Sequence, residues 1–572
     1  MDEGHNSLER WQAKIRRLRQ CLKGWAKNTS GAYKKEKKKL LAKLDELDKK
    51  AESTLLDQNE LNLKYVLNER LSELLREEEI KWYQRAKVKN LLEGDANTKY
   101  FQLVANGKHR KTRIFRLEQE EGLIHGDAKL KKYITTYYKK LFGPSNHNNL
   151  VMDESYRDDI PQVTAEENDL LVAEFTEEEI RGAIFQMNHN TAPGPDGFPP
   201  EFYPVFWNVI KDDLMPLFID FNKGELPLHS LKFGTIILIP KSKEAKQIQQ
   251  YRHICLSNVS FKFFTKVATN RIVKIAQRII KPSQIAFLPR RNIMEGVVIL
   301  HETLHELHKR KQNGIIFKID FEKAYDKVNW NFLQQALRMK GFHPVWCDWV
   351  KVFVQGGNVG IKVNDQMGSY FQTKKGLRQG DPLSPILFNI VVDMLAIILS
   401  RAKEEGQIKG VVTHLVENGL SILQYADDTV LFFDHDIEQA KNLKLLLGTF
   451  EQLSGLKINF HKSELFCFGQ AKEFEEQYSY LFGCKMGSYP FRYLGLPMHY
   501  RKLYNKDWKL IEERIKKKLS GWKGKHLSYG GRLVLINSVL SSLPMFMMSF
   551  FEVPRGVLKK IEYFRSQFFF AK

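Results

Sequence analysis

The chain has few cysteines for its length, five in 572 residues. Cys21, Cys255, Cys347, Cys467 and Cys484 form no CxxC pair and have no histidines at zinc-binding spacing. Neither a disulfide framework nor a structural zinc module is therefore predicted. We expect reduced thiols, as in an intracellular protein.

The sequence also has no obvious export signal and no clean apolar run. Its first residues, "MDEGHNSLERWQAK", are polar, which argues against a signal peptide. The C-terminal stretch "SSLPMFMMSFFEVPRGVLKK" comes closest to a membrane span, but Pro544, Glu552 and Pro554 interrupt it. We expect a buried helix with a turn there and no membrane segment.

Positive charge is what the chain has in surplus. Its 89 Lys and Arg against 67 Asp and Glu leave a formal net charge of +22. A hydrophobic content of 43% indicates a folded chain, and its length predicts two to four domains. A surplus of this size favours a nucleic-acid partner, the alternative being a cationic surface that only keeps the protein soluble.

Residues 1–142 are predicted to form a basic helical extension. Leucines recur there at helical spacing among charges, which predicts long amphipathic helices, paired in the manner of a coiled coil. The cluster Lys34–Lys39 is either a solvated face or a binding site. A segment with His109, Arg110, Lys111 and Arg113 among aromatics is typical of nucleic-acid binding. Residues 143–174 are expected to be a flexible connection.

Two strand-like runs carry acidic residues where a site could form. "GIIFKID" (314–320) ends in Asp320, and "SILQYADDTVLFF" (421–433) is interrupted by Asp427 and Asp428, as a hairpin would be at its tip. If these strands are neighbours, the three carboxylates converge, and a hard divalent cation such as Mg²⁺ would relieve their repulsion. Two such ions a short distance apart can catalyse in-line phosphoryl transfer, one activating the attacking oxygen and the other holding the leaving group. Taken alone, each motif is more often a polar turn or strand end.

Between these strands lies "KKGLRQGDPLSPILFNIVVDML", a loop that opens a long apolar helix. Asp381 and Pro382 mark the predicted helix start. Gly376 and Gly380 let the backbone approach a ligand, and the side chain of Gln379 offers a donor to phosphate or base. "FGTIILIPK" (233–241) is a further predicted strand.

The order of the motifs "APGPDGFPPEF", "IPK", "QIAFLPRR", "KIDFEKAYDKVNW", "GLRQGDPLSPILFNI", "YADD", "GLKINFHKSE" and "YLGLPM" resembles the reverse transcriptases of non-LTR (LINE-type) retrotransposons, in particular those of plants. The resemblance covers nearly the whole chain. It implies an α+β right-hand polymerase fold, with fingers and palm over 175–498 and a truncated helical thumb over 499–572.

The resemblance also implies roles for single residues. Asp320, Asp427 and Asp428 match the metal-binding aspartates of the palm, with the carbonyl of Phe321 beside the second ion. Tyr325 matches the aromatic gate that lies under the incoming sugar and excludes a 2′-hydroxyl, a core aromatic being the alternative.

Four further residues match positions around the incoming nucleotide. Lys241 and Arg252 would contact the triphosphate of the dNTP, and Gln379 with Gly380 would line its pocket. A solvent-facing salt bridge is the alternative for each basic residue. Lys462 is a candidate general acid for the leaving pyrophosphate, or an ordinary surface lysine.

Departures from the family pattern fall in the expected fingers. "RHICL" stands where Arg-Pro-Ile-Ser-Leu is usual, so His253 and Cys255 replace a proline and a serine, and Pro289 replaces a glycine. Each change could loosen dNTP or template binding without touching the metals. The family's endonuclease segment is not found in this chain, which we interpret as a polymerase fragment.

The leading hypothesis is an RNA-directed DNA polymerase that acts in the nucleus on an RNA template and a DNA primer. It would use dNTPs and two Mg²⁺ ions, with Mn²⁺ as a substitute, and an endonuclease could be supplied separately. The alternatives are an inactive nucleic-acid-binding relic and an organelle-type maturase, the latter disfavoured because the N-terminus lacks a transit peptide.

Overall fold

The apolar run at 314–319 forms the central strand of a five-stranded sheet. Its neighbours are the acid-interrupted hairpin on one side and the strand of "ELFCF" on the other, in the order β12-β11-β5-β10-β9. The strands are β5 (Gly314–Ile319), β9 (Ile422–Tyr425), β10 (Asp428–Phe433), β11 (Glu464–Phe468) and β12 (Lys485–Met486). The apolar residues of β5 are all buried although successive side chains point to opposite faces, so both faces of the sheet are covered at this strand.

The computed structural model describes residues 6–86, 102–107, 112–119, 122–144, 150–189, 191–242, 244–521 and 527–570. Two compact units account for them. One comprises Met1–Ala13 and Ile114–Arg501, and the other comprises Lys14–Arg113 and Lys502–Lys572. Of the predicted nucleic-acid segment, His109, Arg110 and Lys111 lie outside the described residues.

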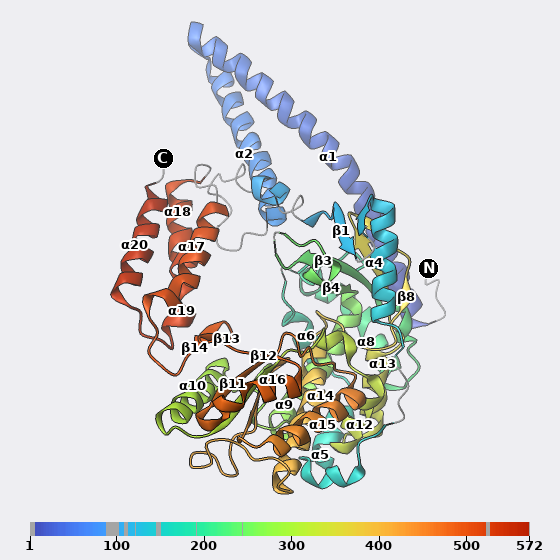
Figure 1. The fold of residues 1–572 in the computed structure, drawn as a ribbon. Coiled ribbons are helices and arrows are strands. Elements are labelled where there is room, and N and C mark those ends of the chain that lie inside the picture. The colour runs from blue at the N-terminus through green and yellow to red at the C-terminus, as the bar shows by residue number, and fades with distance from the viewer. Residues whose placement is uncertain are drawn as a thin grey trace. The chain divides into compact units, whose positions relative to one another are not determined.

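Several helices pack beside the five-stranded sheet (Figure 1). Contacts join α12 to α14 and both of these to α15. These helices are α9 (Val259–Ile279), α10 (Ile293–Lys309), α12 (Trp330–Met339), α14 (Ser384–Glu404) and α15 (Ile437–Ser454). Behind α12, the fully buried Lys340 donates from Nζ to Asp393 Oδ2 at 2.6 Å and to the carbonyl of Ile279 at 2.6 Å. This paired charge joins α12, α9 and α14.

A second sheet has the order β4-β3-β6-β7, with β8 paired to β6. Its strands are β3 (Phe233–Pro240), β4 (Tyr251–Ser257), β6 (Asn358–Val363), β7 (Gln366–Met367) and β8 (Phe371–Gln372). Helix α4 (Asp127–Leu141) packs on this sheet, burying Leu130, Ile134 and Tyr138 in one apolar cluster with the strands.

Shorter elements complete the first unit. They are β1 (Arg116–Gln119), β2 (Gly122–His125), α5 (Ala165–Val172), α6 (Glu177–Phe185), α7 (Phe202–Val205), α8 (Trp207–Asn222), α11 (Ala324–Lys327), α13 (Pro344–Val354), α16 (Glu475–Phe482), β13 (Phe491–Tyr493) and β14 (Leu496–Met498). The stretch predicted as a flexible connection thus contains α5, which begins with a capping box between Thr164 and Glu167.

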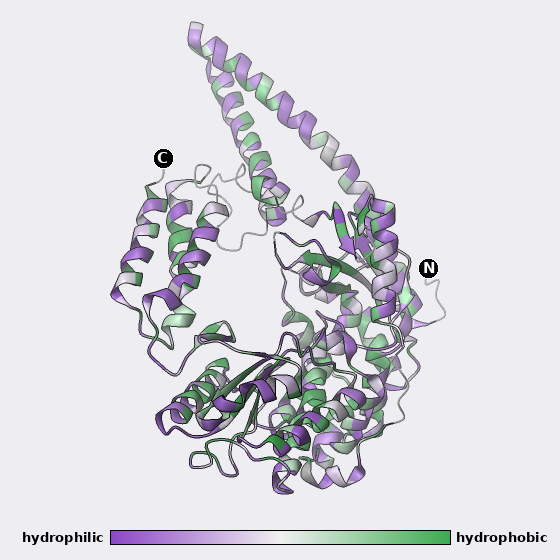
Figure 2. Ribbon diagram, viewed as in Figure 1, coloured by the Kyte–Doolittle hydropathy of each residue, from purple (hydrophilic) through white to green (hydrophobic). Residues whose placement is uncertain are grey.

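The predicted long helices of the N-terminal extension are α1 (Ser7–Ser53) and α2 (Gln58–Ala86). They pair antiparallel, burying Leu40 and Leu44 against Leu67 and Leu74, with the ion pair Arg70–Glu36 at 2.8 Å. Figure 2 shows that both helices are largely hydrophilic, whereas hydrophobic residues gather on the sheet strands. The first turns of α1 belong to the other unit, where Trp11 Nε1 donates to Ser260 Oγ at 3.0 Å.

The C-terminal helices are α17 (Lys509–Gly521), α18 (Tyr529–Leu535), α19 (Ser542–Met548) and α20 (Arg555–Phe569). They pack on one another, with Trp508 fully buried and Lys560 paired to Glu512 at 2.9 Å. The domain boundaries proposed from the sequence stay a prediction.

The sequence predicted no membrane-spanning segment, an expectation that length and composition alone do not overturn. Among the residues that the structure describes, two stretches are long and apolar enough to cross a membrane by length and composition alone, Ser384–Glu404 and Tyr529–Met548. Ser384–Glu404 is the core helix α14, and 83% of this stretch is buried inside the protein. Its apolar composition is therefore explained by packing in the core. All five cysteines are free.

Candidate active site

The acidic motif "YADD" forms the tip of the hairpin between β9 and β10. Asp428 pairs with Tyr425, so Ala426 and Asp427 make the turn. Ala426 has a φ of 55°, in the left-handed region that a residue with a Cβ rarely adopts. A two-residue turn with positive φ has the twist that joins antiparallel strands tightly. The two aspartates are therefore held at the very end of the sheet.

The register of the sheet brings the third aspartate beside them. Thr429 of β10 lies opposite Ile319 of β5 in an antiparallel pair. The next residue along β5 is Asp320, and the preceding residue of β10 is Asp428, so both stand at the same end of neighbouring strands. The strands predicted to carry the acids are thus adjacent.

All three carboxyl groups are held in a setting that disfavours their charge. Burial raises the pKa of each one above its ordinary value of 3.8. The charge on Asp427 raises the pKa of Asp320 and of Asp428 further. Lys462 opposes this at Asp320, and Arg252 opposes it at Asp427. The three carboxylates, Lys462 and Arg252 are therefore close enough to act on one another electrostatically.

The donor set suits a hard divalent cation. Carboxylate oxygens are the ligands that Mg²⁺ and Mn²⁺ prefer, and three mutually repelling carboxylates gain most from such an ion. In the part of the chain that the structure describes, no group of three or more His, Cys, Asp and Glu side chains is already gathered tightly enough to hold a metal. The site thus fits a divalent cation by the chemistry of its side chains and by the placement of its backbone.

Backbone contacts fix the position of Asp320. Its N–H donates to Ser463 Oγ at 3.1 Å, and its carbonyl accepts from Asn459 N at 2.7 Å. The adjacent Phe321 bridges to Ile458. Sequence analysis missed Ser463 and Asn459, although they flank Lys462 in the motif "KINFHKSE". Their placement brings exposed Lys462 to the same end of the sheet.

Tyr325 lies against the long apolar helix rather than free in solvent. Its ring stacks on Phe388 of α14, with centroids 4.5 Å apart and an interplanar angle of 14°. Burial raises the pKa of its hydroxyl, and the charge of Asp427 adds to the effect. The aromatic is therefore half-buried and within electrostatic range of the hairpin tip.

The other residues predicted to contact the nucleotide come from the second sheet and the glycine-rich loop. Lys241 and Arg252 are exposed at the end of the β3–β4 pair where the loop connects the two strands, and Ile239 pairs there with Arg252. The carbonyl of Gln379 accepts from Cys255 N at 3.2 Å, which ties the loop to β4. Gly380 is exposed with a φ of 103°, which only glycine adopts without strain.

Residues 239–498, which contain this whole constellation, match the family described as Reverse transcriptase (RNA-dependent DNA polymerase). The chain contains a reverse transcriptase region. Among curated proteins it is 25% identical over 473 residues to the "Transposon TX1 uncharacterized 149 kDa protein" of Xenopus laevis, covering 80% of this chain and 35% of that protein. It is 29% identical over 291 residues to the "Retrovirus-related Pol polyprotein from type-2 retrotransposable element R2DM" of Drosophila melanogaster, covering 50% and 26%.

A third relative is the "Retrovirus-related Pol polyprotein from type-1 retrotransposable element R2" of Nasonia vitripennis, 27% identical over 242 residues and matched over 42% of this chain and 22% of that protein. The resemblance to reverse transcriptases of non-LTR retrotransposons is thus confirmed. The chain spans about a third of the length of the first of these relatives and about a quarter of the next two.

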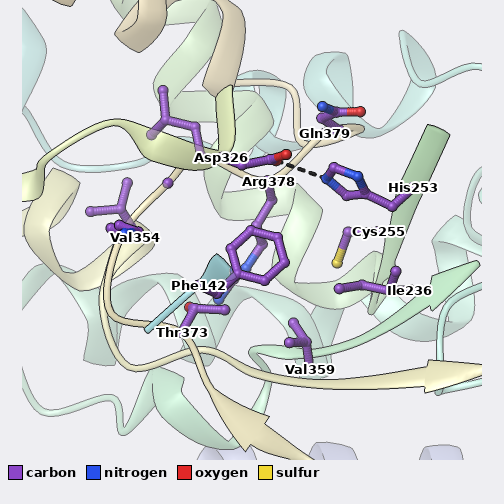
Figure 3. A pocket seen from close by; sticks show the side chains of 13 residues that line it. Phe142, Ile236, His253, Cys255, Asp326, Val354, Val359, Thr373, Arg378 and Gln379 are labelled. Atoms are coloured by element: carbon purple, nitrogen blue, oxygen red, sulfur yellow. Dashed lines mark hydrogen bonds and ion pairs between the residues drawn. The ribbon is translucent and has the colours of Figure 1, made fainter. Parts of the chain in front are cut away.

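Of the three positions that sequence analysis marked as departures from the family pattern, His253 and Cys255 are buried and Pro289 is exposed. His253 is buried on β4, and its Nε2 lies 2.7 Å from Oδ1 of Asp326, a residue that is itself only 1% exposed. The rings of Tyr138 and Phe142 meet His253 edge-on. Figure 3 shows the pair beside Arg378, Gln379 and Cys255, around a cavity of about 20 Å³, room for one water molecule.

This pair joins the segments that surround Tyr325. Asp326 directly follows Tyr325, and the backbone carbonyl of Tyr325 accepts from Leu377 N at 2.6 Å. Gly376 approaches the backbone of Asp326 so closely that a Cβ there would lie 2.5 Å from its oxygen. His253 therefore makes a side-chain contact between β4 and α11, at the position where sequence analysis expects a proline in the family. Whether this changes dNTP or template binding stays a prediction.

The contact between His253 and Asp326 should appear as a coupling energy. We expect His253→Ala and Asp326→Ala each to lower the free energy of unfolding, and the double variant to lower it by less than the sum. The expected coupling is about 1–3 kcal/mol, because each single change leaves a buried polar partner unsatisfied. Chemical denaturation of the four proteins measures it, and strictly additive effects would contradict the pairing.

The raised pKa values of the three aspartates predict how stability depends on pH. Between pH 3.8 and the raised values, the folded chain binds more protons at these groups than the unfolded chain, so their contribution to the free energy of unfolding falls as pH rises. Asp427→Asn should therefore raise the melting temperature at pH 7.5, and the gain over wild type should shrink toward pH 5.

Asp436 supplies a control of opposite sign. Although slight burial opposes it, hydrogen bonds from the N–H groups of Glu438 and Gln439 hold the pKa of this helix-capping carboxyl below its ordinary value. Asp436→Asn should lower the melting temperature at pH 7.5 or leave it unchanged. A gain for Asp436→Asn equal to that for Asp427→Asn would show that the effect does not come from the site.

Proposed function

We propose that the chain is an RNA-directed DNA polymerase of a non-LTR retrotransposon, which adds dNTPs to the 3′ end of a DNA primer along an RNA template. The observation that carries the proposal is the register that sets Asp320 beside Asp428 within the family match. The surplus of positive charge supports a nucleic-acid substrate.

The proposal includes a right-hand arrangement. The five-stranded sheet would be the palm, the β3–β4 sheet the fingers and the helices α17 to α20 the thumb. The helices α1 and α2, with the basic segment after them, would form the nucleic-acid-binding extension. An endonuclease could act with the chain, and the nucleus is the proposed place of action.

Asp320, Asp427, Asp428 and the carbonyl of Phe321 would hold two Mg²⁺ ions, which Mn²⁺ could replace. When bound, these ions would lower the charge at the site and stabilise an in-line phosphoryl transfer. The chain's own residues position the reactants: Lys241 and Arg252 hold the triphosphate by charge, and Gln379 with Gly380 bounds the base side of the pocket. Tyr325, held by its stack on Phe388, would lie where a 2′-hydroxyl of the incoming nucleotide collides with its ring.

Proton transfer at the leaving group falls to Lys462 in this proposal. Burial raises the pKa of the Asp320 carboxyl, and the ammonium of Lys462 is near enough to oppose that rise. An ammonium at this place can give a proton to the departing pyrophosphate as negative charge develops there. Ser463, the next residue, anchors the backbone of Asp320, so Lys462 is held in a defined position.

Extension of a primed poly(rA) template with Mg²⁺ and dTTP tests the function. We expect wild type to extend the primer, and Asp427→Ala to lose about a hundredfold or more of the rate, the scale seen when one group that stabilises transition-state charge is removed. Asp365→Ala, at an exposed turn of the second sheet, serves as the control and should keep the wild-type rate.

A wild-type chain that binds the template without extending the primer would overturn the proposed polymerase activity. It would leave the inactive binding relic, which the substitutions at His253, Cys255 and Pro289 make the second candidate.

A further inference from the structure

Next to the catalytic hairpin, one aromatic side chain is both exposed and held in a strained backbone conformation. Phe287 is 54% exposed and has a φ of 59°. A bulky residue in the left-handed region costs on the order of 1–3 kcal/mol and persists only where the surroundings impose it. The side chain of Phe287 is mostly exposed, so the strained backbone is not offset by burial of its ring. Packing of the fold therefore does not explain why a phenylalanine stands at this position.

The position of Phe287 follows from the strand pairing. Gln284 bridges to Gln424 of β9 in the parallel sense, with Ile285 N donating to the carbonyl of Gln424 at 2.9 Å. Because the two segments run in the same direction, Phe287 lies three residues beyond this bridge just as Asp427 does. The aromatic therefore stands level with the hairpin tip, on the side of β9 away from β10.

A single amide ties this segment to the hairpin. Gln284 is fully buried, and its Oε1 accepts from Ala426 N at 2.9 Å and from Ala286 N at 3.0 Å. The first donor belongs to the turn that carries Asp427, and the second precedes Phe287. The catalytic turn and the aromatic are thus positioned by the same oxygen atom.

Further bonds make the segment rigid. The guanidinium of Arg291 donates to the carbonyls of Gln277, Ile280, Lys281 and Gln284. Asn389 of α14 donates to the carbonyl of Ala286 at 2.6 Å. Between these two anchors Phe287 has little freedom. The exposed Arg290, with a φ of 62°, lies three residues further along.

We propose that Phe287 is a contact residue for the primer–template duplex, where its ring packs against a base or sugar at the end to which nucleotides are added. An exposed aromatic on a rigid backbone, followed three residues later by an exposed arginine, combines the stacking and positive charge by which proteins hold nucleic acid without reading its sequence. A contact tied to the hairpin tip would set the primer end relative to the three aspartates. The inference rests on the proposed polymerase function for the identity of the duplex.

Duplex binding without nucleotides tests the contact separately from catalysis. The full chain would be titrated into a fluorescently labelled primed RNA template, and the dissociation constant read from anisotropy. We expect Phe287→Ala to weaken binding about tenfold, the loss of one aromatic stack, and Phe287→Tyr to stay within about twofold of wild type. Tyr480→Ala, which removes a 91% exposed aromatic from α16, is the control and should bind like wild type.

Two further measurements separate this role from a structural one. Phe287→Gly relieves the backbone strain, so its melting temperature should equal or exceed that of wild type while its binding is as weak as that of Phe287→Ala. The slope of log affinity against log salt should be unchanged in Phe287→Ala, because no phosphate-binding charge is lost. In Arg290→Gln the slope should become shallower by about 0.7–0.9, because one charge near the duplex is removed.

Binding of Phe287→Ala or Phe287→Gly equal to wild type would overturn the proposal. Because no dNTP is present, this result does not depend on whether the chain can extend a primer. Failure of wild type to extend a bound primer would instead contradict the proposed function and leave the measured effect of Phe287 standing.

Discussion

The site depends on one electrostatic constraint, the placement of three carboxylates at one end of two paired strands. Asp320, Asp427 and Asp428 are partly removed from water, and each has a raised pKa. Ionised carboxylates in such a place cost free energy unless cations neutralise them. Lys462, Lys241 and Arg252 supply part of the opposing charge. In the proposed function, a divalent ion would supply the rest and would also take part in phosphoryl transfer.

Contacts from the surrounding fold keep the three carboxylates in place although they repel one another. β5 is central and apolar, so its end is fixed by pairing on both sides. Ser463 holds the backbone of Asp320, and Gln284 holds the turn before Asp427. The long helix α14 adds the ring of Phe388 under Tyr325 and the amide of Asn389 behind Phe287. These contacts are neutral hydrogen bonds and ring packing, which add no charge to a crowded site.

The sequence predicted the parts of this site that have local signals. Alternation and apolar runs gave β3, β5 and the β9–β10 hairpin nearly to the residue, and α14 begins at Ser384, three residues after the predicted start at Asp381. The adjacency of Asp320 to the hairpin was a condition in the sequence argument, and the register fulfils it. The roles of the individual residues stay predictions.

What the sequence could not predict depends on side chains that meet from distant segments. Nothing local marks His253 as the partner of Asp326, 73 residues away, or Gln284 as the support of a turn 142 residues later. The strain at Phe287 is equally invisible, because "AFLP" has no turn signal that would require a positive φ. Residues 143–174 were expected to be flexible because of their polar composition, yet the Thr164 capping box and burial of Leu171 give a helix.

Binding of Mn²⁺ to the full chain at pH 7.5, followed by electron paramagnetic resonance, tests the central claim most directly. If the three carboxylates form one cation site, wild type binds the ion saturably. Asp427→Asn binds it at least about tenfold more weakly, since the ion loses one of its negatively charged ligands. Equal Mn²⁺ affinity in wild type and Asp427→Asn would contradict the account.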